Sequence, residues 1–380
     1  MINNNDETNH PHEEIAATIL ETNNEVEETN PVLLASLHKI DRDLQDPIFR
    51  EVNTEDAEVY VAQLIQETVG NPNRRGYKFN ATSPVSSFIL DIFNKQDDES
   101  IKDIFNANCT NIAIRLLLAE KRSVQKYPSM NAPRKGSLII TSNKNNECVL
   151  ITIAKIETAD FLEDVNLQLQ SGLPIDKKAL KTAIIKVTEL GTDVEMEITV
   201  TDSSSGIAKY WTDEFLEVTE ITSDEQNTKN AFNHIEKVLS QNLKKQAPSD
   251  YTELRNNLVG YFKTQTAFQY DELINQVFGT YTFDNPEVSL DDIKEKVNKL
   301  VQKEKFDTHF TLVPSEIKAR FKKTYKVSDE IELRTNGHIE GLRHIIKATT
   351  NTIGEKILEI KVENDTIYKE FEFNHEENEN

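Results

Sequence analysis

The sequence predicts an α+β protein in which an antiparallel sheet packs with amphipathic helices, followed by a helical middle segment and a small α+β C-terminal region. Two patterns support this fold class. Apolar residues recur at helical spacing in 54–69 and 104–116, and β-rich runs follow between about 137 and 200. With 380 residues and 37% hydrophobic content, the chain is long enough to bury one large core or two to three smaller ones.

The first 31 residues differ from the rest of the chain. They contain eight acids and no Lys or Arg, so they supply −8 of the formal net charge of −22. They have few large apolar residues to offset the entropy of ordering, and we predict a disordered acidic tail over residues 1–31. The folded region begins after Pro31, where VLLASLHKI is compatible with a buried strand or the start of a helix.

The pattern of residues 32–202 predicts an N-terminal α+β domain. Thr54 is placed to cap a helix that ends near Val69, and 104–116 repeats the helical pattern. The runs SLIITS and CVLITIAKI flank the polar NKNNE and predict an antiparallel hairpin. Further strands are expected at 181–187 and 194–200. In the second, apolar and polar residues alternate, so one face should be exposed to solvent.

A helical region is predicted over residues 203–305. The segment SSSG makes a break after the last strand, and apolar residues at 231, 235, 238 and 239 then indicate a strong helix. The last helix of this region opens at Ser289 with a start that resembles a capping box and runs to about Lys303.

A C-terminal α+β region is predicted over residues 306–374, followed by a short acidic tail at 375–380. The segments ILEIKV and TIYKEFEF are separated by a polar Glu-Asn-Asp. This pattern predicts a β-hairpin with a tight turn near Asn364 and Asp365.

Several classes of protein lack support in the sequence. No run approaches the roughly 18 apolar residues that a membrane span needs, and the N-terminus is acidic where a signal peptide is basic, so we expect a cytoplasmic protein. Cys109 and Cys148 have no metal or redox spacing, which leaves no basis for a disulfide framework or a zinc site. No nucleotide, metalloprotease or hydrolase motif is present, so no catalytic residue, metal or cofactor is predicted.

One enzymatic alternative remains open. Metal-dependent nucleases place a Glu and a Lys two residues apart on a strand, where both side chains can meet a metal and its water. Glu359 and Lys361 have this spacing. The simpler interpretation is that they form the wet side of a strand whose Leu358, Ile360 and Val362 face a core.

The clearest cationic feature lies in EIKARFKKTYKV. Its basic residues have no acid between them, and Phe321 and Tyr325 are interleaved. If the segment is helical, Ile317, Phe321 and Tyr325 fall at i, i+4 and i+8 and form a buried seam, with the basic residues fanned toward solvent or phosphate. The candidate nucleic-acid-binding residues are Lys318, Arg320, Lys322, Lys323 and Lys326 in this cluster, with Arg343, Lys347, Arg134 and Lys135 outside it.

Smaller basic islands, such as Arg74 and Arg75, lie near Gly or Pro. For each island taken alone, a solvated face is as good an interpretation as a phosphate site. The net charge of −22 also opposes phosphate binding, which depends on Lys and Arg.

The middle of the chain resembles a known family. The resemblance is carried by DFLEDVNLQLQSGLPIDKKALKTAIIKV, VEMEITVTDSSSGIAKYWTDEFLEV and NTKNAFNHIEKVL, supported by LLASLHKIDRD upstream and by KVSDEIELRTNGHI and GEKILEIKVENDTIYKEFEF downstream. Together these segments resemble the bacterial nucleoid-associated protein family of the NdpA type. The resemblance is strongest at about 137–245 and touches most of 32–373. It implies association with the nucleoid and DNA binding, without an enzymatic role that transfers by residue.

The acidic N-terminal tail and the uninterrupted KARFKK cluster depart from the family pattern and leave open a specialised member from a mobile element or an antiviral defence locus. We therefore expect a protein that binds DNA, most readily the duplex, through local basic patches with little sequence preference. The first alternative is an acidic protein-interaction or DNA-mimic module, and the second is the nuclease. A protein partner and a homo-oligomer are left open.

Overall fold

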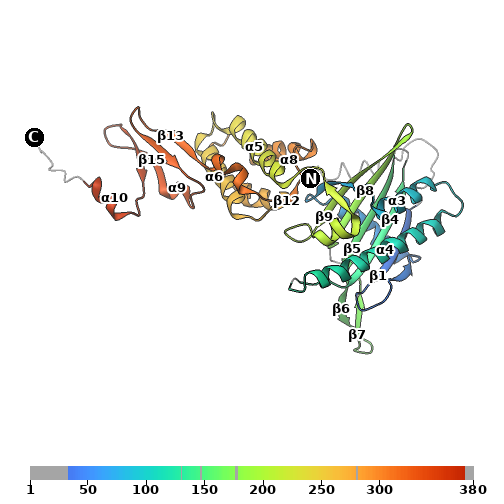
Figure 1. Ribbon diagram of the computed structural model, residues 1–380. Helices are drawn as coiled ribbons and strands as arrows, with labels where there is room; N and C mark the ends of the chain where they lie inside the picture. The colour runs from blue at the N-terminus through green and yellow to red at the C-terminus, as the bar shows by residue number, and fades with distance from the viewer. Residues whose placement is uncertain (1–32, 130, 146–147, 176–178, 280, 373–380) are drawn as a thin grey trace, which may run out of the picture. The chain divides into compact units, whose positions relative to one another are not determined.

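The computed structural model describes residues 33–129, 131–145, 148–175, 179–279 and 281–372 (Figure 1). The chain divides into two compact units. Unit 1 comprises Met1–Asn227, Thr266–Asp271 and Phe306–Leu312, and unit 2 comprises Thr228–Gln265, Glu272–Lys305 and Val313–Asn380. The predicted α+β class is confirmed, whereas the predicted domain boundaries at 202 and 305 stay predictions. The two predicted acidic tails, residues 1–31 and 375–380, lie wholly outside the described residues.

Unit 1 is built around an eight-stranded antiparallel sheet with the order β10-β3-β9-β8-β5-β4-β1-β2. The apolar run after Pro31 is a strand, and the predicted hairpin and the two strands after it are confirmed as β4, β5, β8 and β9. The strands of the sheet are β1 (Leu33–Ile40), β2 (Ile48–Glu51), β3 (Arg75–Phe79), β4 (Gly136–Lys144), β5 (Val149–Glu157), β8 (Lys181–Leu190), β9 (Asp193–Asp202) and β10 (Val218–Glu220).

Helices cover both faces of this sheet because its strands carry apolar residues on both faces. On one face, α3 (Pro84–Asn94), α4 (Ile101–Lys126) and η1 (Tyr210–Leu216) share a large core with Leu138 and Ile140 (Figure 1). On the opposite face, α2 (Glu55–Val69) packs on the neighbouring Ile139. The Thr54 hydroxyl accepts a hydrogen bond from the Ala57 amide at 3.3 Å, which confirms the predicted cap.

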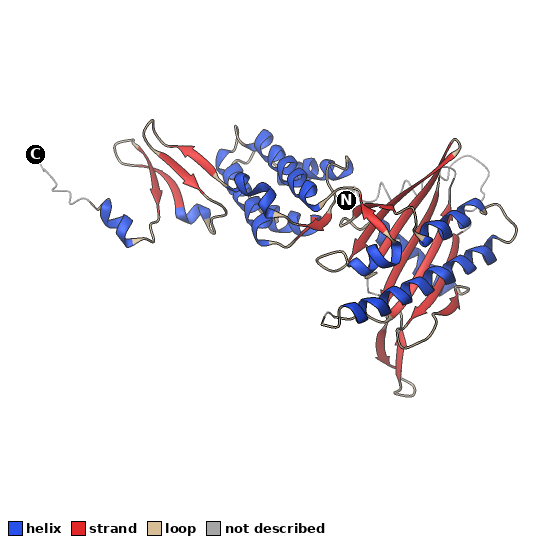
Figure 2. Ribbon diagram, viewed as in Figure 1, coloured by secondary structure: helices blue, strands red, loops and turns tan. Residues whose placement is uncertain are grey.

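Two short strand pairs complete unit 1. The strands β6 (Ala159–Leu162) and β7 (Leu169–Gly172) form a hairpin, and β11 (Ala267–Gln269) pairs with β12 (His309–Thr311). Figure 2 shows how the strands dominate this unit. The last two strands come from segments that are about forty residues apart in the sequence, and Phe268 stacks on Phe310 at 4.7 Å to hold them together.

Unit 2 contains the predicted helices and a series of short elements. The Ser289 hydroxyl accepts from the Asp292 amide at 3.3 Å and caps α8, which confirms the predicted start of that helix. The elements, of which α5 and α7 begin in the last residues of a unit 1 segment, are α5 (Asp224–Leu243), α6 (Pro248–Thr264), α7 (Tyr270–Leu273), η2 (Ile274–Phe278), α8 (Leu290–Gln302), η3 (Pro314–Phe321), β13 (Lys323–Lys326), β14 (Glu332–Thr335), α9 (Leu342–Ile345), β15 (Ile346–Thr350), β16 (Lys356–Ile360) and α10 (Asp365–Glu370).

The predicted C-terminal hairpin with a turn at Asn364 and Asp365 is wrong. The strand KILEI (β16) pairs with the preceding β15, and α10 begins at Asp365, within the predicted turn. The Asn364 side chain accepts hydrogen bonds from the amides of Thr366 and Ile367 at 3.0 and 3.3 Å. Asn favours both turns and helix N-caps, and here it caps a helix.

Candidate nucleic-acid interface

The basic cluster begins on η3, a 3-10 helix that is anchored by apolar side chains. Ile317 is 2% exposed and Phe321 is 6% exposed. The Phe321 ring lies 6.2 Å from the ring of Phe232 on α5, which in turn contacts Phe262 on α6 at 5.3 Å. Burial of these aromatic residues fixes η3 against the two long helices and leaves Lys318 exposed to solvent.

The predicted single helix through the cluster is wrong in its second half. The 3-10 helix ends at Phe321, and Lys323–Lys326 form β13, which pairs with β14. Of the predicted seam, Ile317 and Phe321 are buried, whereas Tyr325 lies on the strand and is only partly buried. The change of structure directs consecutive lysines to different sides of the backbone.

Lys323 lies over two aromatic rings. Its Nζ is 4.3 Å from the ring centroid of Tyr251 on α6 and 5.1 Å from that of Tyr325. Partial burial, followed by the positive charges of Arg255 and Lys244, lowers the pKa of Lys323 to about 8. The structure therefore gathers cations from α6 and from the end of α5 beside this lysine, and an anion placed among them would favour its charged form.

Glu236 on α5 organises the arginines near Lys323. Its carboxylate accepts from Arg320 Nη2 at 2.7 Å and from the Tyr251 hydroxyl at 3.1 Å, and lies 3.4 Å from Arg255 Nε. Arg255 Nη2 also donates to the Arg320 carbonyl at 2.5 Å. These contacts position the end of η3 and use part of the charge of Arg320.

We call Lys244, Lys318, Arg320, Lys322 and Lys323 the basic ridge. Lys244, Lys318 and Lys322 are exposed. Within the described part of the chain, no carboxylate forms an ion pair with any of these three lysines. Sequence reasoning missed the contributions of Lys244 and Arg255 because these residues lie about 60–80 positions before Lys318–Lys323, with α8 and several shorter elements between them.

Other predicted residues of unit 2 have acidic partners. Lys326 pairs with Asp329 at 2.6 Å. Arg343 lies within 3.3 Å of the buried Asp250, 3.0 Å of Asp284 and 3.9 Å of Glu253. Three surrounding carboxylates make Arg343 a structural link between α6 and α9 and reduce what it can offer to phosphate. Lys347 on β15 is exposed and lies opposite Glu359 in the strand register.

The predicted cations of unit 1 are also paired. Arg134 contacts Glu157 at 2.7 Å, and Lys135 contacts Asp41 at 2.9 Å and Asp43 more closely. Hydrogen bonds to these two carboxylates raise the pKa of Lys135.

Arg75, from one of the smaller islands, has a side chain that is 4% exposed and lies 2.7 Å from Asp224 and 3.2 Å from Glu220. It is therefore part of the interior of unit 1. Its low exposure leaves little of it for a ligand.

Unit 1 also contains a buried ion pair that the sequence did not indicate. Lys155 on β5 contacts Glu120 on α4, with side chains that are 1% and 0% exposed. Burial lowers the pKa of Lys155 and raises that of Glu120. Lys181 and Asp202 form a second pair at 2.5 Å close by. The first pair joins α4 to the sheet, and the second joins the neighbouring strands β8 and β9.

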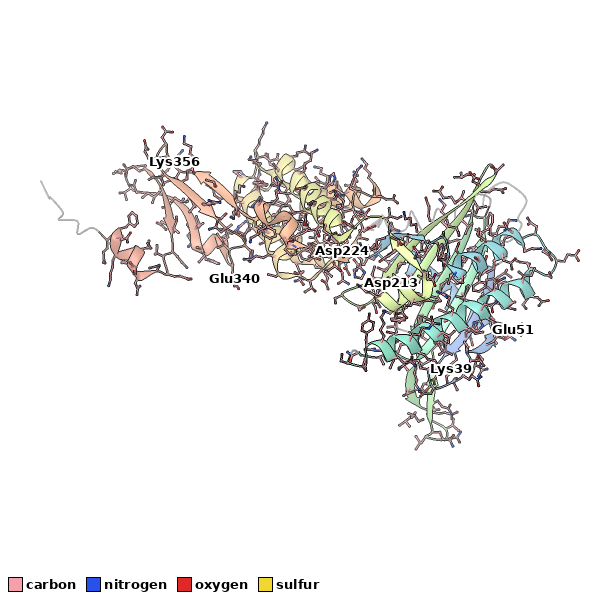
Figure 3. All side chains as sticks on the ribbon, viewed as in Figure 1. Lys39, Glu51, Asp213, Asp224, Glu340 and Lys356 are labelled. Atoms are coloured by element: carbon pink, nitrogen blue, oxygen red, sulfur yellow. The ribbon has the colours of Figure 1, made fainter. Side chains whose placement is uncertain are left out.

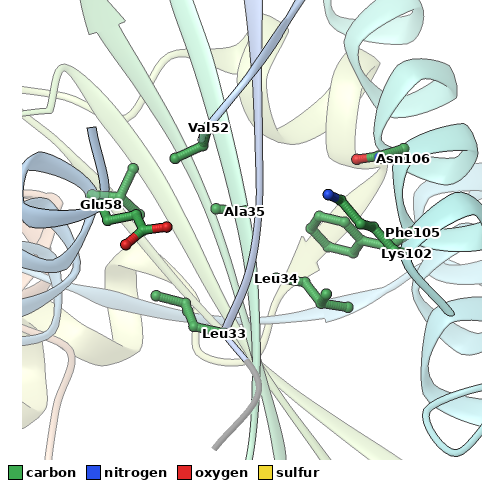
Figure 4. A pocket seen from close by; sticks show the side chains of 9 residues that line it. Leu33, Leu34, Ala35, Val52, Glu58, Lys102, Phe105 and Asn106 are labelled. Carbon is green, nitrogen blue, oxygen red and sulfur yellow. The ribbon is translucent and has the colours of Figure 1, made fainter. Parts of the chain in front are cut away.

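A hollow of about 400 Å³ opens beside the start of β1 (Figure 4). Leu33, Leu34 and Phe105 supply apolar walls, and Glu58 and Lys102 lie at its margin. The Lys102 ammonium is 3.1 Å from Glu51, so the charge of this lysine is already partnered. The described lining of the hollow is apolar apart from Glu58, Lys102 and Asn106.

Glu359, which the nuclease hypothesis pairs with Lys361, lies on the β15–β16 hairpin. Glu359 on β16 lies opposite Lys347 and its Oε1 accepts from the Thr349 hydroxyl at 3.3 Å. Over the described ranges, no group of three His, Cys, Asp or Glu side chains is arranged to hold a metal ion. Side chains across both units are drawn in Figure 3.

Residues 36–356 match the family described as NA37, nucleoid-associated protein YejK. No curated protein gives a significant match to the chain. Among the helices of the described residues, none is long and apolar enough to cross a membrane.

Proposed function

We propose that this chain, which belongs to the NA37 family of nucleoid-associated proteins, binds duplex DNA through the basic ridge of unit 2. Family membership supports a nucleoid-associated DNA-binding role in bacteria. The observation that carries the choice of site is the exposure of Lys318 and Lys322, which have no carboxylate partner among the described residues, in a chain with a net charge of −22. Most other predicted cations are neutralised by nearby acids.

The ridge is suited to phosphate contact rather than to base readout. Lysine ammonium groups act as point charges that bind phosphate oxygens without reading the bases. The segment that presents them is an eight-residue 3-10 helix followed by a four-residue strand. We therefore expect contacts to the DNA backbone and little sequence preference.

The net negative charge does not prevent this binding at physiological salt. Exposed charges separated by more than about 8 Å are largely screened at 0.15 M ionic strength. Local lysines therefore dominate the interaction, while more distant carboxylates oppose it mainly at low salt. Partial burial holds the pKa of Lys323 at about 8, and phosphate beside it would stabilise the protonated form.

A variant in which Lys318, Arg320, Lys322 and Lys323 are changed to Gln tests the site. It should bind every duplex sequence more weakly, and the slope of log affinity against log salt should flatten by up to roughly 0.9 for each lost phosphate contact. The exposed Lys318 and Lys322 contribute little to folding, so any loss of stability should come from the Arg320–Glu236 pair and from the contact of Lys323 with the Tyr251 ring, and thermal unfolding of the variant measures it. Fluorescence anisotropy over a salt titration measures both affinity and slope.

The matched control removes the same charge from unit 1. Lys102, Lys126, Lys144 and Lys186 are exposed and paired with acids, and their change to Gln should leave the salt slope near that of the parent protein. If the ridge variant keeps the parent affinity and slope, the ridge is not the site. Arg134, Lys135, Arg343 and Lys347 would then be tested next.

One assay separates the three classes of function. In a gel-shift titration with duplex and single-stranded DNA, with and without magnesium, retarded intact DNA supports binding. Cleavage that requires magnesium supports a nuclease that uses Glu359 and Lys361. No effect on DNA supports an acidic interaction or DNA-mimic module, which the charge of −22 favours. The mobile-element or defence setting stays a prediction.

A further inference from the structure

The β15–β16 hairpin near the C-terminus has no core of its own. It is a two-stranded sheet, and no other strand in the described ranges pairs with it (Figure 2). Every described residue from 347 to 372 except Asn351 is exposed. A two-stranded hairpin alone is marginally stable in water, whereas three or more strands with an apolar face are stable. This part of the fold therefore lacks a partner.

The two faces of the hairpin have different chemistry. Ile346 lies opposite Ile360, and Ala348 lies opposite Leu358, so these side chains share one face. Leu358, Ile360 and the following Val362 are 39%, 44% and 47% exposed. The adjacent α10 adds exposed Ile367, Tyr368 and Phe371 at 43%, 55% and 71%. Extended apolar surface of this kind marks an interaction site.

The opposite face carries Glu359 on β16 and Lys361 directly after the strand. Lys347 lies opposite Glu359, and the pairing continues through the Lys361 amide, which donates to the Ile345 carbonyl at 2.9 Å. Glu359 and Lys361 thus lie on one face at successive positions. Lys356, at the start of the strand and labelled in Figure 3, lies on the apolar face two positions before Leu358.

We propose that β16 pairs antiparallel with β16 of a second copy of this chain, with Ile360 opposite its own counterpart on the two-fold axis. In this register Glu359 lies opposite Lys361 of the second copy, and Lys361 lies opposite Glu359. Leu358 lies opposite Val362. Directly opposed residues in an antiparallel pair have Cβ atoms about 5 Å apart, so both opposite-charge pairs and both apolar pairs are in contact.

Neighbouring registers are worse. A shift that moves the axis by one residue to Glu359 or to Lys361 places two like charges opposite each other. A shift that moves the axis by half a residue, to a point between two residues, places charged residues opposite apolar residues and mixes the two faces. Of these neighbouring registers, the one centred on Ile360 is therefore the one that opposes Glu359 with Lys361, and this complementarity favours a second copy as the occupant of the free edge.

The resulting four-stranded sheet solves the problem of the isolated hairpin. It has the order β15-β16-β16-β15, merges the apolar faces of both copies, and has the isologous interface of a two-fold dimer. It also accounts for the Glu359 and Lys361 spacing without metal chemistry. A dimer carries two basic ridges, but the pairing itself does not depend on the proposed DNA binding.

Charge reversal of the full chain tests the proposal by sedimentation velocity. The parent protein should sediment at twice the mass of the chain. E359K places Lys opposite Lys361 of the second copy, and K361E places Glu opposite Glu359, each at two symmetry-related positions. Either change should weaken dimerisation on the order of tenfold or more, since like charges directly opposite are destabilising.

An equimolar mixture of E359K and K361E supplies the decisive measurement. The mixed pair opposes two lysines of one chain with two glutamates of the other, so a heterodimer should form although each variant alone is largely monomeric. Misfolding of a variant cannot produce this recovery. The matched control is E197K, which reverses an exposed acid of the Lys186–Glu197 pair in unit 1 and should leave the dimer unchanged.

Three results would overturn the proposal. The parent chain could be monomeric at about 100 μM, well above the micromolar range of ordinary specific interfaces. Both variants could remain dimeric, which would place the interface elsewhere. The mixture could remain monomeric, which would exclude the stated register.

Discussion

The two units use their cations in different ways. In unit 1 the side chains of Lys155 and Arg75 are 1% and 4% exposed, and each contacts carboxylates. In unit 2 Lys318 and Lys322 are exposed, without a carboxylate partner in the described part of the chain. Removing one member of a buried pair leaves an uncompensated charge, whereas removing an exposed lysine does not. The charges of Lys155 and Arg75 therefore support the folding of unit 1, whereas Lys318 and Lys322 lie exposed to solvent on unit 2.

The largest expected effect is on the buried pair of unit 1. Glu120→Gln leaves the Lys155 ammonium buried without its counterion and should reduce the free energy of unfolding by about 3–5 kcal/mol. Urea denaturation monitored by circular dichroism measures this loss. Glu197→Gln, at an exposed pair 3.8 Å from Lys186, is the control and should change stability by less than about 1 kcal/mol. Equal effects of the two variants would remove the contrast between buried and exposed charge.

A comparable loss is expected where unit 2 anchors its ridge. Phe321→Ala removes a ring that is 6% exposed and packs on Phe232, and should destabilise the protein by about 3–5 kcal/mol. DNA affinity should fall only through unfolding, so the folded fraction should bind with the parent salt slope. Ile331→Ala, at a side chain that is 58% exposed, is the control and should have little effect on either measurement.

The sequence predicted the elements whose pattern is local. Thr54 and Ser289 mark helix starts because each cap needs only an amide three residues ahead. Strand β9 is visible because apolar and polar residues alternate from Val194 to Thr201, and β8 because 181–187 is rich in β-forming residues. The polar Glu-Asn-Asp near Asn364 was misassigned because a turn and a helix cap use the same residue type, and the partner of β16 precedes it in the chain.

The candidate site was predicted only in part, for a different physical reason. The density of lysines in 318–326 is a property of the sequence, but the partners of these lysines are not. Glu236 reaches Arg320 from 84 positions away, and Glu120 reaches Lys155 from a helix across the sheet. Whether a cation is free or neutralised depends on such long-range contacts, which periodicity and composition do not encode.

A smaller effect is expected from a polar group that unit 1 buries without charge. His38 is fully buried, with ring nitrogens 3.4 Å from Ser36 Oγ and 3.2 Å from Thr110 Oγ1, and burial lowers its pKa to about 4. The unfolded chain binds a proton below about pH 6.5, while the native state stays neutral until about pH 4. Stability should therefore be intact above pH 6.5 and fall by about 3 kcal/mol as the pH drops to 4.

The control for this pH dependence is His38→Gln. Carboxylates also titrate between pH 4 and pH 6.5, so the contribution of His38 is the difference between the unfolding free energies of the two proteins across that range. The difference between the unfolding free energies of the parent and the His38→Gln variant should narrow as the pH falls, because only the parent protein loses the stability that the neutral histidine contributes. Parallel curves would show that folding does not lower the pKa of His38.

The smallest effect is expected from the acidic N-terminal sequence, which lies outside the described residues. Deleting residues 2–30 removes eight carboxylates and no Lys or Arg, so DNA affinity should be unchanged or improved, with the gain largest at low salt. The melting temperature should stay the same because this segment has few apolar residues to contribute to a core. A full-length variant with the eight acids changed to Gln or Asn separates charge from chain length and should match the deletion in DNA affinity. A large drop in the melting temperature of the deletion variant would mean that the segment packs on the fold. Weaker DNA binding by both the deletion and the eight-site variant would mean that these acids support the complex with DNA.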